Sequence, residues 1–232
     1  MNLFQLLEES TGVPWVLWSA FSASVLLLLT GTLVRARLAT AQGGVVPDAG
    51  FSLRNVVEVL VEMLADLAEK NMGPKWRSYF PIIGTIFFFI LISNLLGLIP
   101  GFAGATGSAD TTWAWATISF VLHQYVGIRE HGFGYINHFL GPRFTRYRLP
   151  LIVFPYALIE VISHLTRVGT LSIRLFANMF ADHTIVGVWL LLVPAVVPAL
   201  FMGLGLLVAF LQAYVFAMLS MVYIGLALQE AH

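Results

Sequence analysis

Five long apolar stretches constrain the fold of this chain more than any other feature. They cover residues 14–34, 79–100, 111–128, 149–193 and 199–228. About 20 apolar residues are enough to cross a hydrocarbon core roughly 30 Å thick. Only 10% of the residues are charged and 59% are hydrophobic, whereas about a quarter of a soluble domain is charged. We therefore predict a single all-α membrane domain, residues 1–232, with about five transmembrane helices.

Two segments depart from a simple span. Residues 51–71 place apolar side chains on one helical face and charged side chains on the other, which predicts an amphipathic helix at the cytoplasmic interface or against a partner. Residues 149–193 would extend about 67 Å as one helix. Such a helix must tilt steeply or break at a weak point, for which Pro155, Gly169 and Gly187 are candidates.

The basic residues orient the spans. Six of the 12 Lys and Arg lie between the first and second spans and four between the third and fourth. By the positive-inside rule, the amino terminus and the loops 101–110 and 194–198 face outward, and the carboxyl terminus faces the cytoplasm. The first span follows Glu8 and Glu9 instead of a positive segment, so we expect a retained helix and not a signal peptide.

Several classes of site are excluded by composition. The chain has no cysteine, which excludes disulfides and thiolate metal ligands. Its net charge is zero, and no basic cluster with exposed aromatic residues indicates nucleic acid. No phosphate-binding loop follows a strand. We expect no nucleotide site, no cofactor and no metal. Asn94 is predicted to form a hydrogen bond between helices, and His123 and Gln124 are predicted to lie at the interface or to form hydrogen bonds between helices.

Polar residues form a stripe within the fourth apolar stretch. Successive steps of four and three residues connect Glu160, His164, Arg167, Leu171, Arg174 and Asn178. Lipid cannot satisfy such a stripe, so it must face water, protein or an ionisable partner. Arg167 has two interpretations, an ion pair with Glu160 about two turns away or a role in an aqueous path.

Arg174 requires a different explanation. A guanidinium stays charged at physiological pH, and at the centre of a membrane helix it costs about 2.5 to 3.5 kcal/mol even on a lenient scale. No acid lies three, four or seven residues from Arg174, and the nearest on the stripe is Asp182. We therefore expect its counter-charge on another polypeptide.

Three segments carry a resemblance to a known family. They are residues 79–101, YFPIIGTIFFFILISNLLGLIPG, residues 171–179, LSIRLFANM, and residues 211–216, LQAYVF. In this order they resemble subunit a of the F-type ATP synthase membrane sector, over residues 55–225.

The resemblance implies a mechanism. Subunit a lies against a rotating ring of c subunits, within a complex that includes the b subunits of the peripheral stalk. Its last two long helices form a tilted hairpin along the ring, and two offset half-channels carry protons to and from it. Arg174 would face the c-ring carboxylate. The chain itself would not be an enzyme, and H⁺ or Na⁺ as the carried ion stays open.

The resemblance also assigns the remaining site residues. The inner half-channel would contain Glu160, Ser163 and Arg167, and the outer one Asn178, Asp182, His183 and Gln212. His183 is half a turn out of phase with Arg174, so it should point towards the other helices of this subunit. Many members carry an ionisable residue where this chain has Gly205. Asp182 is either part of that outer relay or an interfacial acid without a partner.

Two other functions are weighed against this one. A stand-alone secondary transporter can keep an intramembrane arginine, but we find no internal repeat in this sequence. A structural anchor would need an acid for Arg174 within the chain. We expect a multi-pass protein of a bacterial plasma membrane, with a plastid thylakoid membrane as the lesser alternative.

Overall fold

The computed structural model describes residues 3–40, 52–99, 101–132, 150–193 and 196–229. Within these ranges the regular structure is entirely helical, which confirms the predicted fold class. The helices are α1 (Leu3–Thr11), α2 (Trp15–Thr40), α3 (Leu53–Met72), α4 (Trp76–Leu98), α5 (Ala109–His131), α7 (Pro150–Leu192) and α8 (Val196–Gln229), with short 3₁₀ helices η2 (Gly73–Lys75) and η3 (Ala105–Gly107).

Four helical runs in the described residues are long and apolar enough to cross a membrane. They are Trp15–Leu38, Leu53–Leu98, Leu165–Leu192 and Val196–Leu228, the second of which joins α3, η2 and α4. The predicted third span, α5, is not among them. It is more polar, and its neighbours satisfy part of that polarity, because Ser119 lies 2.7 Å from the Ser220 hydroxyl of α8 and Thr112 accepts a 3.1 Å bond from Ser172 of α7.

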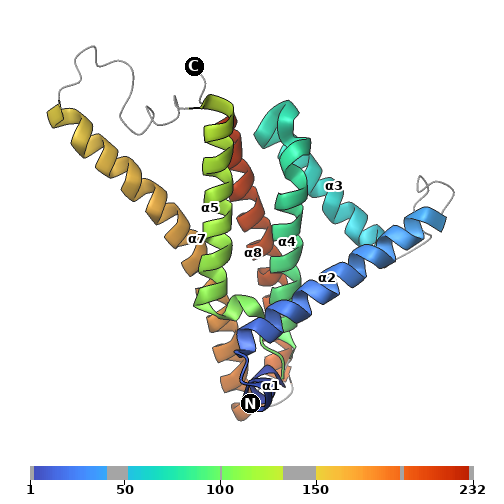
Figure 1. The fold of residues 1–232 in the computed structure, drawn as a ribbon. Coiled ribbons are helices and arrows are strands. Elements are labelled where there is room, and N and C mark those ends of the chain that lie inside the picture. Colours follow the sequence, from blue (N-terminus) through green and yellow to red (C-terminus); the bar gives the residue numbers. More distant parts are fainter. Residues whose placement is uncertain (1–2, 41–51, 100, 133–149, 194–195, 230–232) are drawn as a thin grey trace.

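In the helical bundle, α8 packs against both α4 and α5, and α7 packs against α5 and α8. α7 and α2 lean towards opposite sides of the bundle (Figure 1). The core between α4 and α8 contains fully buried Phe87, Ile90, Phe216 and Ile224. α7 is one uninterrupted helix of 43 residues, so the long fourth stretch tilts instead of breaking. It turns into α8 at the same end of the bundle as α1 (Figure 1).

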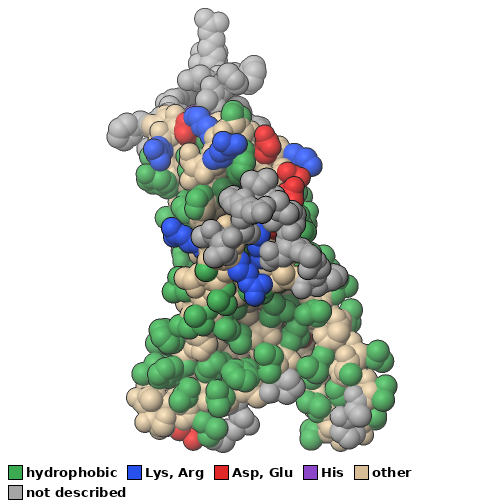
Figure 2. Space-filling view, turned by 90° about the vertical axis from the view of Figure 1, so that its right-hand side faces the viewer, with side chains coloured by type: hydrophobic (Ala, Val, Ile, Leu, Met, Phe, Trp, Pro, Cys, Tyr) green, Lys and Arg blue, Asp and Glu red, His purple; other side chains and the backbone are tan. Residues whose placement is uncertain are grey.

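At the other end of the bundle, side-chain contacts connect the end of α5 to the segment that follows α3 and to the end of α8. A side-chain hydrogen bond and ion pair joins Lys75 to Glu130, and this hydrogen bond lowers the pKa of the Glu130 carboxyl. The ring of His131 lies 2.7 Å from the carbonyl oxygen of Ala227. On the face shown in Figure 2, most charged side chains lie in the upper part, and the lower part is mostly hydrophobic. This distribution suits a charged cytoplasmic end above a lipid-facing surface.

Candidate functional site

Arg174 lies on the outer face of the tilted helix. Its neighbours Leu171 and Leu175 are 5% and 1% exposed and anchor α7 to the core, whereas the Arg174 side chain is exposed. Among the described residues, no carboxylate lies within ion-pair distance of its guanidinium. The sequence-based expectation that the counter-charge comes from another polypeptide therefore stays a prediction that this geometry favours.

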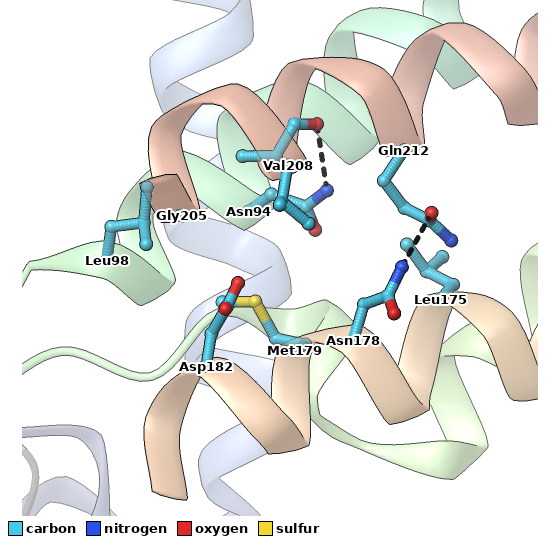
Figure 3. A pocket seen from close by; sticks show the side chains of 10 residues that line it. Asn94, Leu98, Leu175, Asn178, Met179, Asp182, Gly205, Val208 and Gln212 are labelled. Atoms are coloured by element: carbon cyan, nitrogen blue, oxygen red, sulfur yellow. Dashed lines mark hydrogen bonds between the residues drawn. The ribbon is translucent and has the colours of Figure 1, made fainter. Parts of the chain in front are cut away.

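One turn further along α7, two amides join α7 to α8. Asn178 Nδ2 donates a 3.0 Å hydrogen bond to Gln212 Oε1, and Gln212 is only 6% exposed (Figure 3). Behind this pair, Asn94 of α4 donates to the Ala209 carbonyl at 3.3 Å and accepts from the Thr106 hydroxyl at 2.6 Å. The bond to α8 confirms that Asn94 connects two helices. It also adds Asn94 to the wall of the site.

A small pocket lies between these helices (Figure 3). Ten residues line it, namely Asn94, Leu98, Leu175, Asn178, Met179, Asp182, Gly205, Val208, Ala209 and Gln212. Its volume is about 10 Å³, close to the space that a single water molecule needs. A Cβ on Gly205 would lie 3.7 Å from Asp182 Oδ2. Gly205 of α8 therefore lies opposite the Asp182 carboxylate of α7 across this pocket.

A second, larger cavity of about 200 Å³ lies beside this pocket, towards the α7–α8 turn. Asp182 and His183 line it together with the end of α4 and the following loop, including Gly97 and Phe102. His183 Nε2 lies 3.2 Å from the position that a Cβ on Gly97 would occupy. The imidazole thus points at α4, and two ionisable side chains share one cavity wall.

On the other side of Arg174, Arg167 lies over an aromatic ring. Its guanidinium carbon is 4.2 Å from the ring centroid of Tyr223, a cation–π contact. Both side chains line a small cavity with Ser119 and His123 of α5. Tyr223 was not among the predicted site residues, because its contact depends on which face of α8 meets α7.

The remaining inner residues are only partly placed. The Ser163 side chain is exposed, and its carbonyl accepts a 2.9 Å bond from Thr166. The side chains of Glu160 and His164 lie outside the described residues, so the Glu160–Arg167 ion pair stays a prediction. Within the described ranges, no group of three or more His, Asp or Glu could hold a metal ion.

Comparison with known proteins identifies the family. The model of the family described as "ATP synthase A chain" matches residues 16–225, beginning well before the three motifs. The chain belongs to this family. "ATP synthase subunit a 1" of Syntrophotalea carbinolica is 44% identical over 90% of this chain and 84% of its own length. The subunit a of Trichlorobacter lovleyi is 38% identical over 100% of this chain and 93% of its own. The chain is therefore a non-catalytic, multi-pass membrane subunit of an F-type ATP synthase.

Proposed function

We propose that this subunit a conducts protons through two offset half-channels and couples their flow to rotation of a c ring. The observation that carries the proposal is the position of Arg174. It is exposed on the tilted α7, and no acid of the described residues lies within ion-pair distance of it. On one side of it is the small pocket beside Asn178 and Gln212, and on the other the cavity that Arg167 lines. A permanent charge in this place suits an ionised carboxylate on a neighbouring ring.

The outer path would run through the two cavities beside the α7–α8 turn. His183 and Asp182 exchange protons with water in the larger cavity, and Asp182 also borders the smaller pocket. The Asn178–Gln212 amide pair leads from that pocket towards Arg174. Because Gly205 supplies no ionisable group, Asp182 takes the role that an ionisable side chain at position 205 would have.

At the ring, Arg174 would do two things. Its charge favours the ionised form of an approaching carboxylate, because an opposite charge nearby stabilises that form. It also repels protons, which blocks a direct leak between the half-channels. On the inner side, Arg167, Ser163 and Glu160 would line the exit. Each elementary charge that crosses gains roughly 2.3 kcal/mol per 100 mV of membrane potential.

The assembly follows from the same proposal. The c ring, the b subunits of the peripheral stalk and the surrounding lipid are the expected partners, and a bacterial plasma membrane is the expected location, since the relatives come from bacteria. Residues of the ring would decide between H⁺ and Na⁺. Co-purification of the chain with small hydrophobic hairpin proteins and ATPase activity supports this assignment, and isolation as a lone functional carrier contradicts it.

The decisive test replaces Arg174 in the whole complex. Arg174→Ala should abolish ATP-driven proton pumping in inverted vesicles and leave assembly intact. Arg174→Lys should fail nearly as badly, because an ammonium is more localised and loses its proton more readily when desolvated. Arg129→Ala is the control, since Arg129 is exposed at the end of α5, away from both cavities. Normal pumping by the alanine variant would refute the proposed role.

A further inference from the structure

Two apolar side chains separate the outer cavity from the pocket beside the amide pair. Leu98, Met179 and Asp182 line both spaces, whereas His183 borders only the outer cavity and Gln212 only the pocket. Of the three shared residues, Leu98 and Met179 are apolar. Asp182 therefore supplies the polar side chain among the three residues that line both spaces.

Each apolar side chain of this boundary rests against a glycine. A Cβ on Gly97 would overlap the terminal methyl group of Met179, and a Cβ on Gly104 would lie 3.0 Å from the same methyl carbon. Similarly, Leu98 Cδ2 lies only 2.6 Å from the position of a Cβ on Gly205. The contacts at Gly97 and Gly205 are shorter than real Cβ atoms show, so these two glycines make the space that the two side chains fill.

Met179 is also held in place from the core side. It is 5% exposed and follows Leu171 and Leu175 on the buried face of α7. Methionine has an unbranched, flexible side chain that fills irregular gaps and changes rotamer easily. An added atom in the glycine slot would therefore shift the Met179 methyl group before it shifted a helix.

We propose that Met179 and Leu98 form an apolar constriction across the outer path, with the Asp182 carboxylate as its proton-exchanging passage. This inference rests on the proposed function of the two cavities. Asp182 takes a proton from water in the outer cavity and releases it to the single water of the pocket, so the carboxylate returns to its initial charge after each transfer. The constriction keeps a continuous file of water, and the ions dissolved in it, out of the path to Arg174.

Cysteine accessibility tests the constriction directly, because the chain has no cysteine of its own. Ala209→Cys places one thiol at the wall of the pocket beside the amide pair, and Val186→Cys places one at the wall of the outer cavity. Each is combined with wild-type Met179 or with Met179→Ala in the whole complex. A small, charged, membrane-impermeant methanethiosulfonate is added to the outer side of right-side-out vesicles, and the rate of labelling of this chain is measured.

The expected pattern is specific. Val186→Cys should react quickly in both backgrounds. Ala209→Cys should react slowly with Met179 present and at least about tenfold faster with Met179→Ala. The reactive thiolate forms only where water reaches the sulfur, and a change of one unit in the pKa of the thiol changes the thiolate fraction about tenfold. Equal, rapid labelling of Ala209→Cys in both backgrounds would overturn the constriction. Labelling requires no turnover, so this outcome is separate from a failure of the Arg174 test.

A rescue experiment checks the glycine slot independently. Gly97→Ala should displace the Met179 methyl group into the passage and slow passive proton flux through the membrane sector. Adding Met179→Ala removes the displaced atom and should restore part of the flux, because the new Cβ would still lie 3.2 Å from Gly104 N and from His183 Nε2. Gly203→Ala, whose Cβ meets no atom within 4 Å, should change nothing. If Gly97→Ala slows flux equally with and without Met179, the slot does not act through Met179 and the proposal fails.

Discussion

The close approach of α3 to α8 predicts a stability defect at Gly225. A Cβ there would overlap the carbonyl oxygen of Asn71, lie 3.0 Å from its carbonyl carbon and 3.7 Å from Met72 Cα. All three atoms belong to the backbone, so no rotamer change relieves the overlap. Overpacking of this kind costs about 1–3 kcal/mol. We expect Gly225→Ala to fall at the upper end of that range, because the end of α3 must move off α8.

Heating the detergent-purified complex measures this cost. For a chain of this size, a loss near 3 kcal/mol lowers the melting temperature by roughly 6–12 °C. Gly203→Ala is the matched control on the same helix, where a Cβ meets no atom within 4 Å. Alanine also favours helix over glycine by up to about 1 kcal/mol, so the control should not melt earlier than the wild type. Equal melting of the two variants would refute the predicted contact.

Two further predictions concern the outer path and the topology. In membranes stripped of the catalytic head, the Asp182→Asn, His183→Ala double variant should slow passive proton flux at least about tenfold and change its pH dependence, because a positioned proton-transfer group contributes about a hundredfold or more. Wild-type flux in this variant would mean that water and amide side chains are enough to carry protons along the outer path. A reporter active only in the cytoplasm should work when fused after His232 and fail when inserted after the exposed Gly101, and the reverse result would exchange the inner and outer assignments.

The pattern of apolar and polar residues along the sequence was enough to predict the helices and to indicate Arg174. The length of the apolar stretches predicted the helices, and the spacing of the polar stripe singled out Arg174. Contacts between segments far apart in the sequence could not be predicted from this pattern. Tyr223 under Arg167 and Met179 against Gly97 depend on the rotation of each helix about its axis. A glycine in an apolar helix gives no sign of whether it fits against a neighbour, as Gly97 does, or faces open space, as Gly203 does.

The polarity of α5 shows a second limit of the sequence. Hydropathy alone places it below the four most apolar runs, although it packs against both α7 and α8. A helix surrounded by other helices can keep hydroxyl and imidazole groups, such as those of Ser119 and His123, because protein atoms replace the lipid around them. Hydropathy reports which residues a helix contains and not whether lipid or protein surrounds them.

In the proposed mechanism, the unbroken length of α7 sets the sideways distance between the inner and outer half-channels. Its 43 residues extend about 65 Å, so a helix kept within a 40–45 Å bilayer leans by about 50° from the membrane normal. Ser163 and His183 are about 30 Å apart along its axis, and this lean displaces them laterally by roughly 20 Å, nearly twice the width of a helix. An ion entering beside His183 cannot descend straight to Ser163. In the proposed mechanism, the inclination of α7 thus offsets the two proton paths sideways, which is what a route around the ring requires.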